Sequence, residues 1–419
     1  MRIYHFSEQA YHAAWDIETD SLRVTLPNRH CDPVVASRII NERLDEWQLC
    51  DEIGLNIMVN EHHSSATCLS PSATMPLAML ARQTKNARLL GLGFAIAMRK
   101  DPLWLAEELA YLDVVSGGRL DVGFPKGAPY EVSPTNSNPV KLTERYWDTH
   151  DFLLKAWSHH DGPFNWESPW NEYRQVNIWP RPYQDPHPPI FVTGGSAGTA
   201  RSVGERGHVF ITILGGWNAR KLFDVYRARA VEVGNEFPRP DRFGYCALMG
   251  IGETEAEGHR RLHEIAGYFR TTSTVGEAFM NPPGYMPPAA NAEWLKRNQT
   301  RGRAGSYFPA TTRDGRRLNI GSGAGSGLGV SPAEMVEAAV AFSGTPDQVY
   351  EQIVEFAKYC GGLGNLMIMG QGGELSHADT VDNLSLFARE VLPRLRELDQ
   401  SEFVAAAREL TEAEASSVA

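Results

Sequence analysis

Short apolar runs alternate along the chain with longer segments of helical periodicity. Runs such as 189–194 (PIFVTG) and 365–370 (NLMIMG) are nearly continuous, which is typical of strands buried on both faces. Segments such as 35–53 and 102–116 carry apolar residues at helical spacing and end at a glycine. The alternation predicts βαβ units built around a parallel sheet.

The alternation repeats often enough to predict a closed barrel. The expected strands are 2–6, 55–60, 88–97, 119–124, 189–194, 208–214, 242–252 and 365–370. The expected helices are 35–53, 73–85, 102–116, 141–158, 197–206, 217–234, 254–270, 346–360 and 377–397. Eight strands, each followed by a helix, predict a (β/α)₈ TIM barrel of the α/β class, with a single domain over residues 1–398.

Two segments interrupt the rhythm. Residues 159–188 are rich in Trp and Pro, and we expect an insertion after helix 4, with a hairpin, that either frames a substrate pocket or packs on the outside of the barrel. Residues 271–331 form a longer insertion after strand 7. A loop of this length on the active-site side of a barrel predicts a lid. The tail 399–419 is expected to be a frayed helix or disordered.

Composition and charge exclude several classes of protein. The net charge is −11 and there is no basic patch, so a nucleic-acid partner is not expected. The 5 cysteines are scattered without CxxC spacing, which favours reduced thiols in a cytoplasmic protein. The start has no apolar signal-peptide core. The longest apolar stretch, ARLLGLGFAIAM, is too short and glycine-rich to span a membrane.

Candidate chemistry lies at the expected carboxyl ends of strands, where barrel enzymes place their active sites. Glu61, His62 and His63 follow strand 2. Adjacent side chains of an extended segment point to opposite sides, so at most one of the two histidines faces inward. No second His/Asp/Glu cluster appears at another strand end, and we expect no metal site. His62 fits either an acid–base group with a pKa near neutrality or a packed core histidine.

A second candidate site combines Lys126, after strand 4, with the GGSAGT segment at 194–199, after strand 5. Small residues at the start of a helix favour binding of an anion such as phosphate, and Lys126 would add a positive charge at the same edge. The same segment also fits a plain helix cap on Ser196. Neither a Rossmann GxGxxG nor a P-loop is found in its required context.

Four motifs taken together resemble the bacterial luciferase-like flavin monooxygenases. They are EHH after strand 2, AEELAYLDVVSGGRLDVGFPKG, PPIFVTGGSAGTARSVGERG, and GTPDQVYEQIVEFAKYCGGLGNLMIMG. Their order and spacing suit one barrel. The resemblance runs from about residue 35 to 396 and covers 271–331 poorly. It implies an enzyme that uses reduced FMN, supplied by a separate flavin reductase, and O₂ to oxygenate a small organic substrate through a flavin peroxide intermediate.

The resemblance also implies roles for individual residues. His62 matches the active-site histidine near the reactive edge of the flavin, and Lys126 matches a phosphate-contacting position that is usually arginine. Ser196 and Thr199 match phosphate-binding residues. Ala95 and Ile96 match a pair joined by a non-proline cis peptide beneath the flavin ring. The loop pattern and the resemblance together give these expected cofactor-binding residues: Glu61, Ala95, Ile96, Lys126, Gly194, Gly195, Ser196, Ala197 and Thr199.

The sequence departs from the luciferases themselves. Pro125 and Gly195 stand where the luciferase α-subunit has a cysteine and a glutamate, so light emission is not expected. The family also includes enzymes that use the deazaflavin coenzyme F420, and flavin-binding proteins without clear catalysis, so both remain alternatives. A metal hydrolase built on the histidine pair is a further one. Family members often dimerise, which implies a homodimer or higher homo-oligomer.

Overall fold

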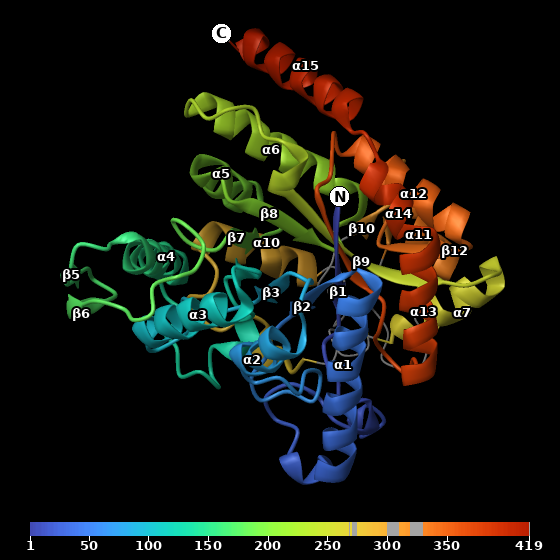
Figure 1. Cartoon of the computed structure of the whole chain (residues 1–419), viewed down its shortest axis with the longest axis horizontal. Helices are drawn as coiled ribbons and strands as arrows, with labels where there is room; N and C mark the ends of the chain where they lie inside the picture. Colours follow the sequence, from blue (N-terminus) through green and yellow to red (C-terminus); the bar gives the residue numbers. More distant parts are fainter. Residues whose placement is uncertain (268, 270–274, 300–309, 319–329, 419) are drawn as a thin grey trace.

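The predicted barrel is confirmed. The computed structural model describes residues 1–267, 269, 275–299, 310–318 and 330–418. Eight parallel strands close into a barrel, because β1 pairs with both β2 and β13 and β8 pairs with β9 (Figure 1). In chain order the barrel strands are β1 (Arg2–Phe6), β2 (Asn56–Val59), β3 (Leu89–Leu92), β4 (Leu120–Phe124), β7 (Ile190–Thr193), β8 (Val209–Ile213), β9 (Phe243–Ile251) and β13 (Asn365–Met369).

Helices surround the barrel (Figure 1). They are α1 (Pro33–Ile53), α2 (Thr74–Gln83), α3 (Pro102–Ser116), α4 (Leu142–Ser158), α5 (Ala197–Arg206), α6 (Ala219–Glu232), α7 (Glu255–Ile265), α12 (Pro346–Tyr359), α13 (His377–Glu390) and α14 (Leu392–Glu397). Local chemistry sets their ends. The Asp32 side chain accepts a hydrogen bond from the Val34 N–H and caps α1, and Gly54, at φ 84°, ends it. The tail forms α15 (Ser401–Val418), which packs against α6 and α12.

Successive side chains of each barrel strand point alternately into the barrel and out towards the helices, as the pleat of a strand requires. The apolar residues pointing inward are Tyr4, Phe6, Met58, Leu90, Leu92, Phe191, Ile211, Cys246, Leu248, Met367 and Met369. Near the amino-terminal end, the Tyr4 hydroxyl donates to Oδ2 of the buried Asp121 at 2.9 Å, and Nε of Arg88 donates to the same oxygen at 2.7 Å. That end is therefore packed, and the open space lies at the carboxyl end.

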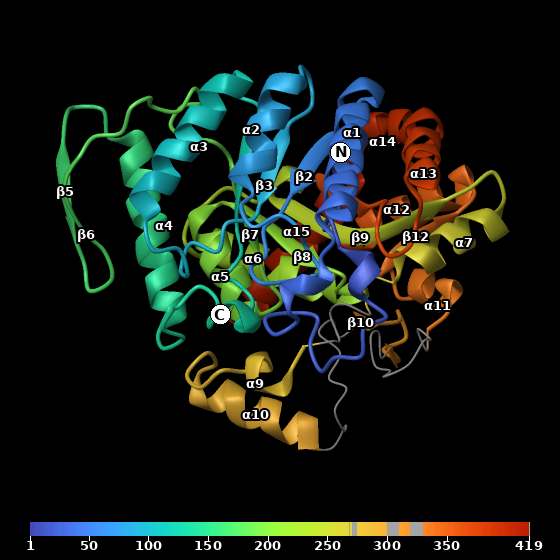
Figure 2. The same ribbon diagram turned by 90° about the horizontal axis from the view of Figure 1, so that it is seen from below.

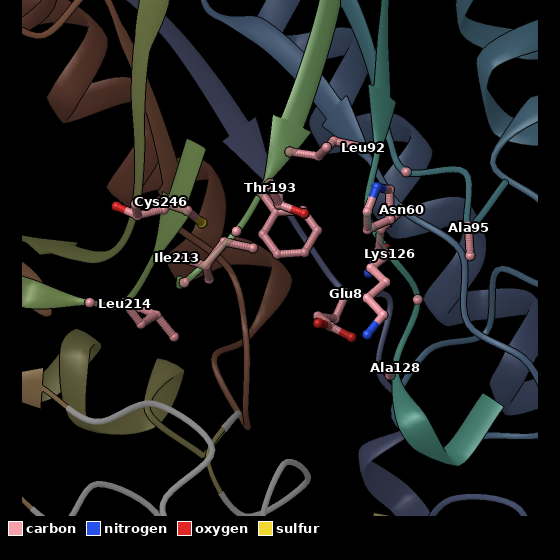
Figure 3. A pocket seen from close by; sticks show the side chains of 18 of the residues that line it. Glu8, Asn60, Leu92, Ala95, Lys126, Ala128, Thr193, Ile213, Leu214 and Cys246 are labelled. Atoms are coloured by element: carbon pink, nitrogen blue, oxygen red, sulfur yellow. The ribbon is translucent and has the colours of Figure 1, made fainter. Parts of the chain in front are cut away.

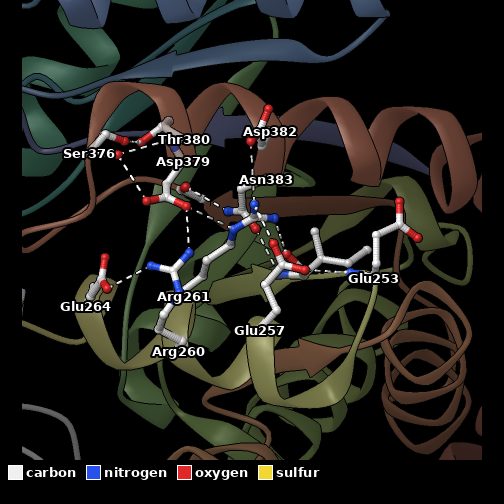
Figure 4. Close-up of polar contacts among 12 residues, drawn as sticks. Glu253, Glu257, Arg260, Arg261, Glu264, Ser376, Asp379, Thr380, Asp382 and Asn383 are labelled. Carbon is white, nitrogen blue, oxygen red and sulfur yellow. Dashed lines mark hydrogen bonds and ion pairs between the residues drawn. The ribbon is translucent and has the colours of Figure 1, made fainter.

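One strand of the main sheet was not predicted. The second half of β9 pairs with β12 (Ala341–Gly344), which follows the short helix α11 (Pro332–Glu337). The segment AFSG is too short and too poor in bulky residues to give a strand signal. A polar network holds this part of β9 against the helices (Figure 4). The guanidinium of Arg261 on α7 donates to the Ile251 carbonyl at 2.8 Å and lies 3.5 Å from Asp379 on α13.

The insertion after α4 is the expected hairpin, with β5 (Phe164–Glu167) antiparallel to β6 (Glu172–Val176). It lies on the outside of the barrel. The ring of Tyr173 stacks on the ring of Phe152 in α4, with 4.7 Å between the centroids. Trp166 packs edge-on against the Phe152 ring, with 5.8 Å between the centroids. We expected this tryptophan-rich segment either to frame a substrate pocket or to pack on the outside of the barrel, and in the structure its hairpin packs on the outside, against α4.

The second insertion is described in part. Its described elements are α9 (Glu277–Met280), α10 (Pro288–Gln299), β10 (Ala310–Thr311) and β11 (Arg317–Leu318). Figure 2 shows α9 and α10 together outside the ring of barrel helices. The Tyr285 hydroxyl, between them, donates to the Gly127 carbonyl at 2.8 Å and joins the insertion to the loop after β4. The predicted lid falls partly on residues 300–309 and 319–329, outside the described residues, and stays a prediction.

Candidate active site

A cavity of about 660 Å³ opens at the carboxyl ends of the barrel strands. Its floor is the top of the barrel interior, and the residues there are Phe6, Met58, Leu92, Cys246, Leu248 and Met369. Polar side chains enter from the loops above this floor (Figure 3). A largely apolar cavity of this size with a few converging polar groups is typical of a small-molecule site.

His62 stands between two buried carboxylates in this cavity. Its Nδ1 atom lies 2.9 Å from Oε1 of Glu131, and its Nε2 atom lies 3.7 Å from Oε2 of Glu8. The first contact is a hydrogen bond, and the second is too long to be one. His63, by contrast, does not line the cavity, so the expectation that one histidine of the pair faces inward is confirmed.

Glu131 is held rigidly. It ends the short helix η3 (Pro129–Glu131), and its Oε2 atom accepts a hydrogen bond from the Ala128 N–H at 2.9 Å. The neighbouring Tyr130 hydroxyl lies 3.2 Å from Nδ1 of His62 and accepts a hydrogen bond from Arg23. Both carboxylate oxygens of Glu131 are thus engaged, and its charge fixes the orientation of the imidazole.

The carboxylates favour the protonated form of the histidine. Burial lowers the pKa of His62, but the charges of Glu131 and Glu8 outweigh burial and leave it above its ordinary value. Burial raises the pKa of Glu131, yet His62 and the Ala128 N–H bring it below its ordinary value. The two carboxylates therefore stabilise the imidazolium form of His62 relative to the neutral imidazole.

Glu61 also lines the cavity, but its carboxylate has structural partners. Its Oε2 atom accepts a hydrogen bond from the N–H of Ala73, the residue before α2, at 3.0 Å, and Arg99 lies 3.4 Å from Oε1. Burial raises the pKa of Glu61, and Arg99 opposes that shift. A contact of Glu61 with a cofactor stays a prediction.

The expected anion site is only partly assembled at the cavity. Lys126, Gly194 and Gly195 line it, whereas Ser196, Ala197 and Thr199 do not. Nζ of Lys126 lies 4.4 Å from the centroid of the Tyr285 ring, and burial lowers the pKa of this lysine.

The start of α5 has the plain helix cap. Oγ of Ser196 accepts a hydrogen bond from the Thr199 N–H at 3.2 Å and lies 2.9 Å from Oγ1 of Thr199. A Cβ atom on Gly194 would come within 2.5 Å of the Thr199 side chain, whereas one on Gly195 would meet nothing within 4 Å. The open side of this turn is therefore at Gly195.

The expected cis peptide is at a different position. The non-proline cis bond joins Leu92 to Gly93, not Ala95 to Ile96. The apolar run 88–97 predicts one strand, but β3 ends at Leu92 and the chain turns there. A Cβ on Gly93 would lie 2.1 Å from the Gly123 carbonyl oxygen, so glycine lets β3 approach β4 at this turn. Ala95 lines the cavity, and Ile96 is buried in the outer core.

Sequence reasoning missed several polar residues of the site, and those around His62 are Glu8, Arg23, Tyr130 and Glu131. Glu8 follows β1 by two positions, so the strand-end rule that found His62 could have found it. Arg23 and Glu131 come from loops and carry no local signal. Within the described ranges, no group of three or more His, Cys, Asp or Glu side chains is arranged to hold a metal ion. No described helix is both long and apolar enough to cross a membrane.

The sequence also matches a family model, the luciferase-like monooxygenases, over residues 22–361. The chain belongs to this family. The matched span contains His62, Glu131 and Lys126, whereas Glu8 lies before it. The matched span contains most of the residues that line the cavity, and Phe6, Glu8 and Met369 lie outside it.

Relatives and solved structures agree with this assignment. The chain is 30% identical over 171 residues to the oxygenase component of a flavin-dependent trigonelline monooxygenase from Acinetobacter baylyi, covering 39% of this chain and 46% of the relative. It is 26% identical to an FMNH₂-dependent dimethylsulfone monooxygenase from Pseudomonas putida, over 73% of this chain and 74% of the relative.

The chain spans about half the length of the first curated relatives it matches. Its fold resembles the oxygenating constituent of 3,6-diketocamphane monooxygenase from Pseudomonas putida, a type II Baeyer–Villiger monooxygenase solved with FMN. The TM-score is 0.63 at 22% identity, over 86% of this chain and 94% of that one.

Proposed function

We propose that this luciferase-like protein is the oxygenase component of a two-component monooxygenase. It would use reduced FMN and O₂ to oxygenate a small organic substrate, by hydroxylation or by Baeyer–Villiger insertion. The observation that carries this proposal is His62, held between two carboxylates in a largely apolar cavity at the mouth of the barrel.

The cavity fits FMN. Its size and apolar floor suit a planar aromatic ring system. Lys126, Gly194 and Gly195 line it beside the amino terminus of α5, where unpaired backbone N–H groups and the helix dipole favour a phosphate. A lysine supplies a point charge there in place of the two-pronged contact of an arginine. Ser196 and Thr199 would contribute if their hydroxyls turn from each other towards the phosphate.

The protein's own groups have separate tasks in this proposal. Bound reduced FMN would supply the electrons that activate O₂. His62 would hold a proton at Nε2, facing the cavity, while Glu131 fixes the imidazole through Nδ1. The apolar floor would exclude water from the reacting groups. Residues 275–299 of the insertion, attached through Tyr285 next to Lys126, would cover the site.

A transient partner follows from this proposal, because the electrons would come from a separate flavin reductase. The test combines the purified protein with such a reductase, NADH, FMN, isotopically labelled O₂ and a panel of small organic compounds. We expect label from O₂ in one product and substrate-dependent NADH consumption. Absence of both with every compound, despite FMN binding, would support a non-catalytic flavin protein. Binding of coenzyme F420 and not FMN would support a dehydrogenase on the same barrel.

We also propose a homodimer or higher homo-oligomer. Large apolar side chains are exposed on α2 and α3, where Met75 is 58%, Trp104 66% and Tyr111 59% exposed. Exposed apolar patches of this kind mark protein–protein contacts. Light scattering is expected to give at least twice the monomer mass, and Tyr111→Glu is expected to shift it to the monomer. A monomer in the unmodified protein would refute this part.

A further inference from the structure

Glu8 places a buried carboxylate in the cavity, 3.7 Å from His62 and therefore paired with it in charge but not by a hydrogen bond. Its side chain projects into the cavity (Figure 3), and the residue is only 7% exposed. Among the residues that the structure describes, its Oε2 atom has no hydrogen-bond partner. A buried acceptor left without a partner is costly, so this oxygen is a candidate for binding a ligand atom.

The loop that carries Glu8 is held in place. The Gln9 N–H donates to the Ser7 hydroxyl at 3.1 Å, and the Gln9 carbonyl accepts from the Leu69 N–H at 3.0 Å. The Ser7 hydroxyl in turn donates to Gln371 at 2.5 Å. Glu8 therefore projects from backbone that is tied to the loop after β2, the same loop that carries His62.

The distance between the Glu8 carboxylate and the His62 imidazole determines which ligand group can bind to both. Oε2 of Glu8 and Nε2 of His62 are 3.7 Å apart, and both residues line the cavity. One oxygen about 2.8 Å from each atom can reach both. It must accept a hydrogen bond from Nε2–H and donate one to the carboxylate. A hydroxyl does both, whereas a ketone pairs with His62 alone and an ammonium group is repelled by the imidazolium.

We propose that Glu8 and His62 together form the polar end of the substrate site and bind a hydroxyl group of the organic substrate. This inference rests on the proposed function, because it names the substrate class of the same cavity. It makes Glu8 a specificity-determining residue. The floor of the cavity is apolar, so the substrate is an otherwise apolar alcohol or phenol.

The test uses four probes that share one carbon ring: cyclohexanol, cyclohexanone, cyclohexylamine and cyclohexane. Binding is measured by ligand-observed NMR with oxidised FMN present and again without it. We expect cyclohexanol to bind about tenfold more tightly than the other three, since a hydrogen bond to a charged group contributes at least that factor.

Two variants at Glu8 test whether its carboxylate causes the preference for cyclohexanol. Glu8→Leu should lower the affinity for cyclohexanol about tenfold and leave cyclohexanone within about twofold. Glu8→Gln keeps the volume and one acceptor oxygen, so its loss should be smaller, and it decides the matter if Glu8→Leu does not fold. The matched control is Glu172→Leu, whose side chain is 71% exposed on the outer hairpin and should change nothing.

The outcomes separate this inference from the proposed function. Failure to bind FMN, together with cyclohexanol binding that depends on Glu8, would remove the flavin proposal and keep the hydroxyl site. Normal FMN binding with equal affinity for all four probes, or with no probe bound, would overturn the hydroxyl site alone. A preference for cyclohexylamine that depends on Glu8 would also overturn it, in favour of a cation.

Discussion

Replacing Glu131 with glutamine tests how the site holds its histidine. The amide has the shape of the carboxylate, but only its oxygen can accept a hydrogen bond, so it keeps one of the bonds from His62 and the Ala128 N–H and loses the charge. Hydrogen bonds to charged groups are roughly twice as strong as neutral ones, and each contributes about 1.5–3 kcal/mol to stability. With one such bond lost and the other weakened, Glu131→Gln should lower the free energy of unfolding by about 2 kcal/mol at about pH 6.

This loss should depend on pH in a definite direction. The pKa of His62 is raised in the folded protein, so its ion pairs stabilise the fold fully below the unfolded-state pKa of about 6.5. That contribution disappears as pH rises through the folded-state pKa. The stability difference between wild type and Glu131→Gln should therefore shrink by about half between about pH 6 and about pH 9.

The assay is urea unfolding of both proteins at the two pH values, with the His62 pKa followed by NMR in parallel. We expect a lower His62 pKa in Glu131→Gln. A control in a His62→Gln background should abolish the pH dependence of the difference. The reasoning would be refuted by a stability difference that is equal at both pH values, or by an unchanged His62 pKa.

Three further substitutions have expected outcomes. His62→Ala should keep FMN binding but lose productive oxygenation, measured as product formed per NADH consumed; equal coupling in the mutant would contradict its role. Lys126→Ala should weaken FMN about tenfold and riboflavin little, measured by fluorescence titration, since a charge-assisted phosphate contact is lost; equal weakening of both ligands would disprove the phosphate contact. Arg261→Met should lower the free energy of unfolding by about 2 kcal/mol, because the buried Ile251 carbonyl loses its side-chain donor and Asp379 on α13 is left with Arg260 as its only cation among the described residues (Figure 4). A change below about 0.5 kcal/mol would mean that this network does not hold α7 to α13.

The barrel could be predicted because its strands are buried on both faces and its helices carry a regular apolar stripe. The end of β3 could not be predicted from the sequence. The residues after Leu92 are as apolar as the strand, and only the close approach of Gly93 to Gly123 ends it. The cis bond was misplaced for the same reason. The short sequence of β12 gives no strand signal of its own, and it is the pairing with β9 that makes this segment a strand.

Site residues that follow a strand end could be predicted, because the topology of a barrel brings strand ends together. Site residues that come from loops distant in the sequence could not be predicted. His62 follows a strand end, and the barrel brings all such ends to one face. Glu131 contacts His62 across 69 positions of sequence, through a loop with no strand or helix pattern of its own before η3. The 194–199 segment was assigned both an anion site and a helix cap. The structure has the cap, and it brings Gly194 and Gly195 to the cavity.

The most direct measurement is an anaerobic titration of the purified protein with reduced FMN, compared with reduced coenzyme F420 under the same conditions. Use of reduced FMN by this cavity predicts saturable binding of FMN at low micromolar concentration, weaker binding in Lys126→Ala, and no comparable binding of F420. Tight binding of F420 with none of FMN would contradict the proposed monooxygenase.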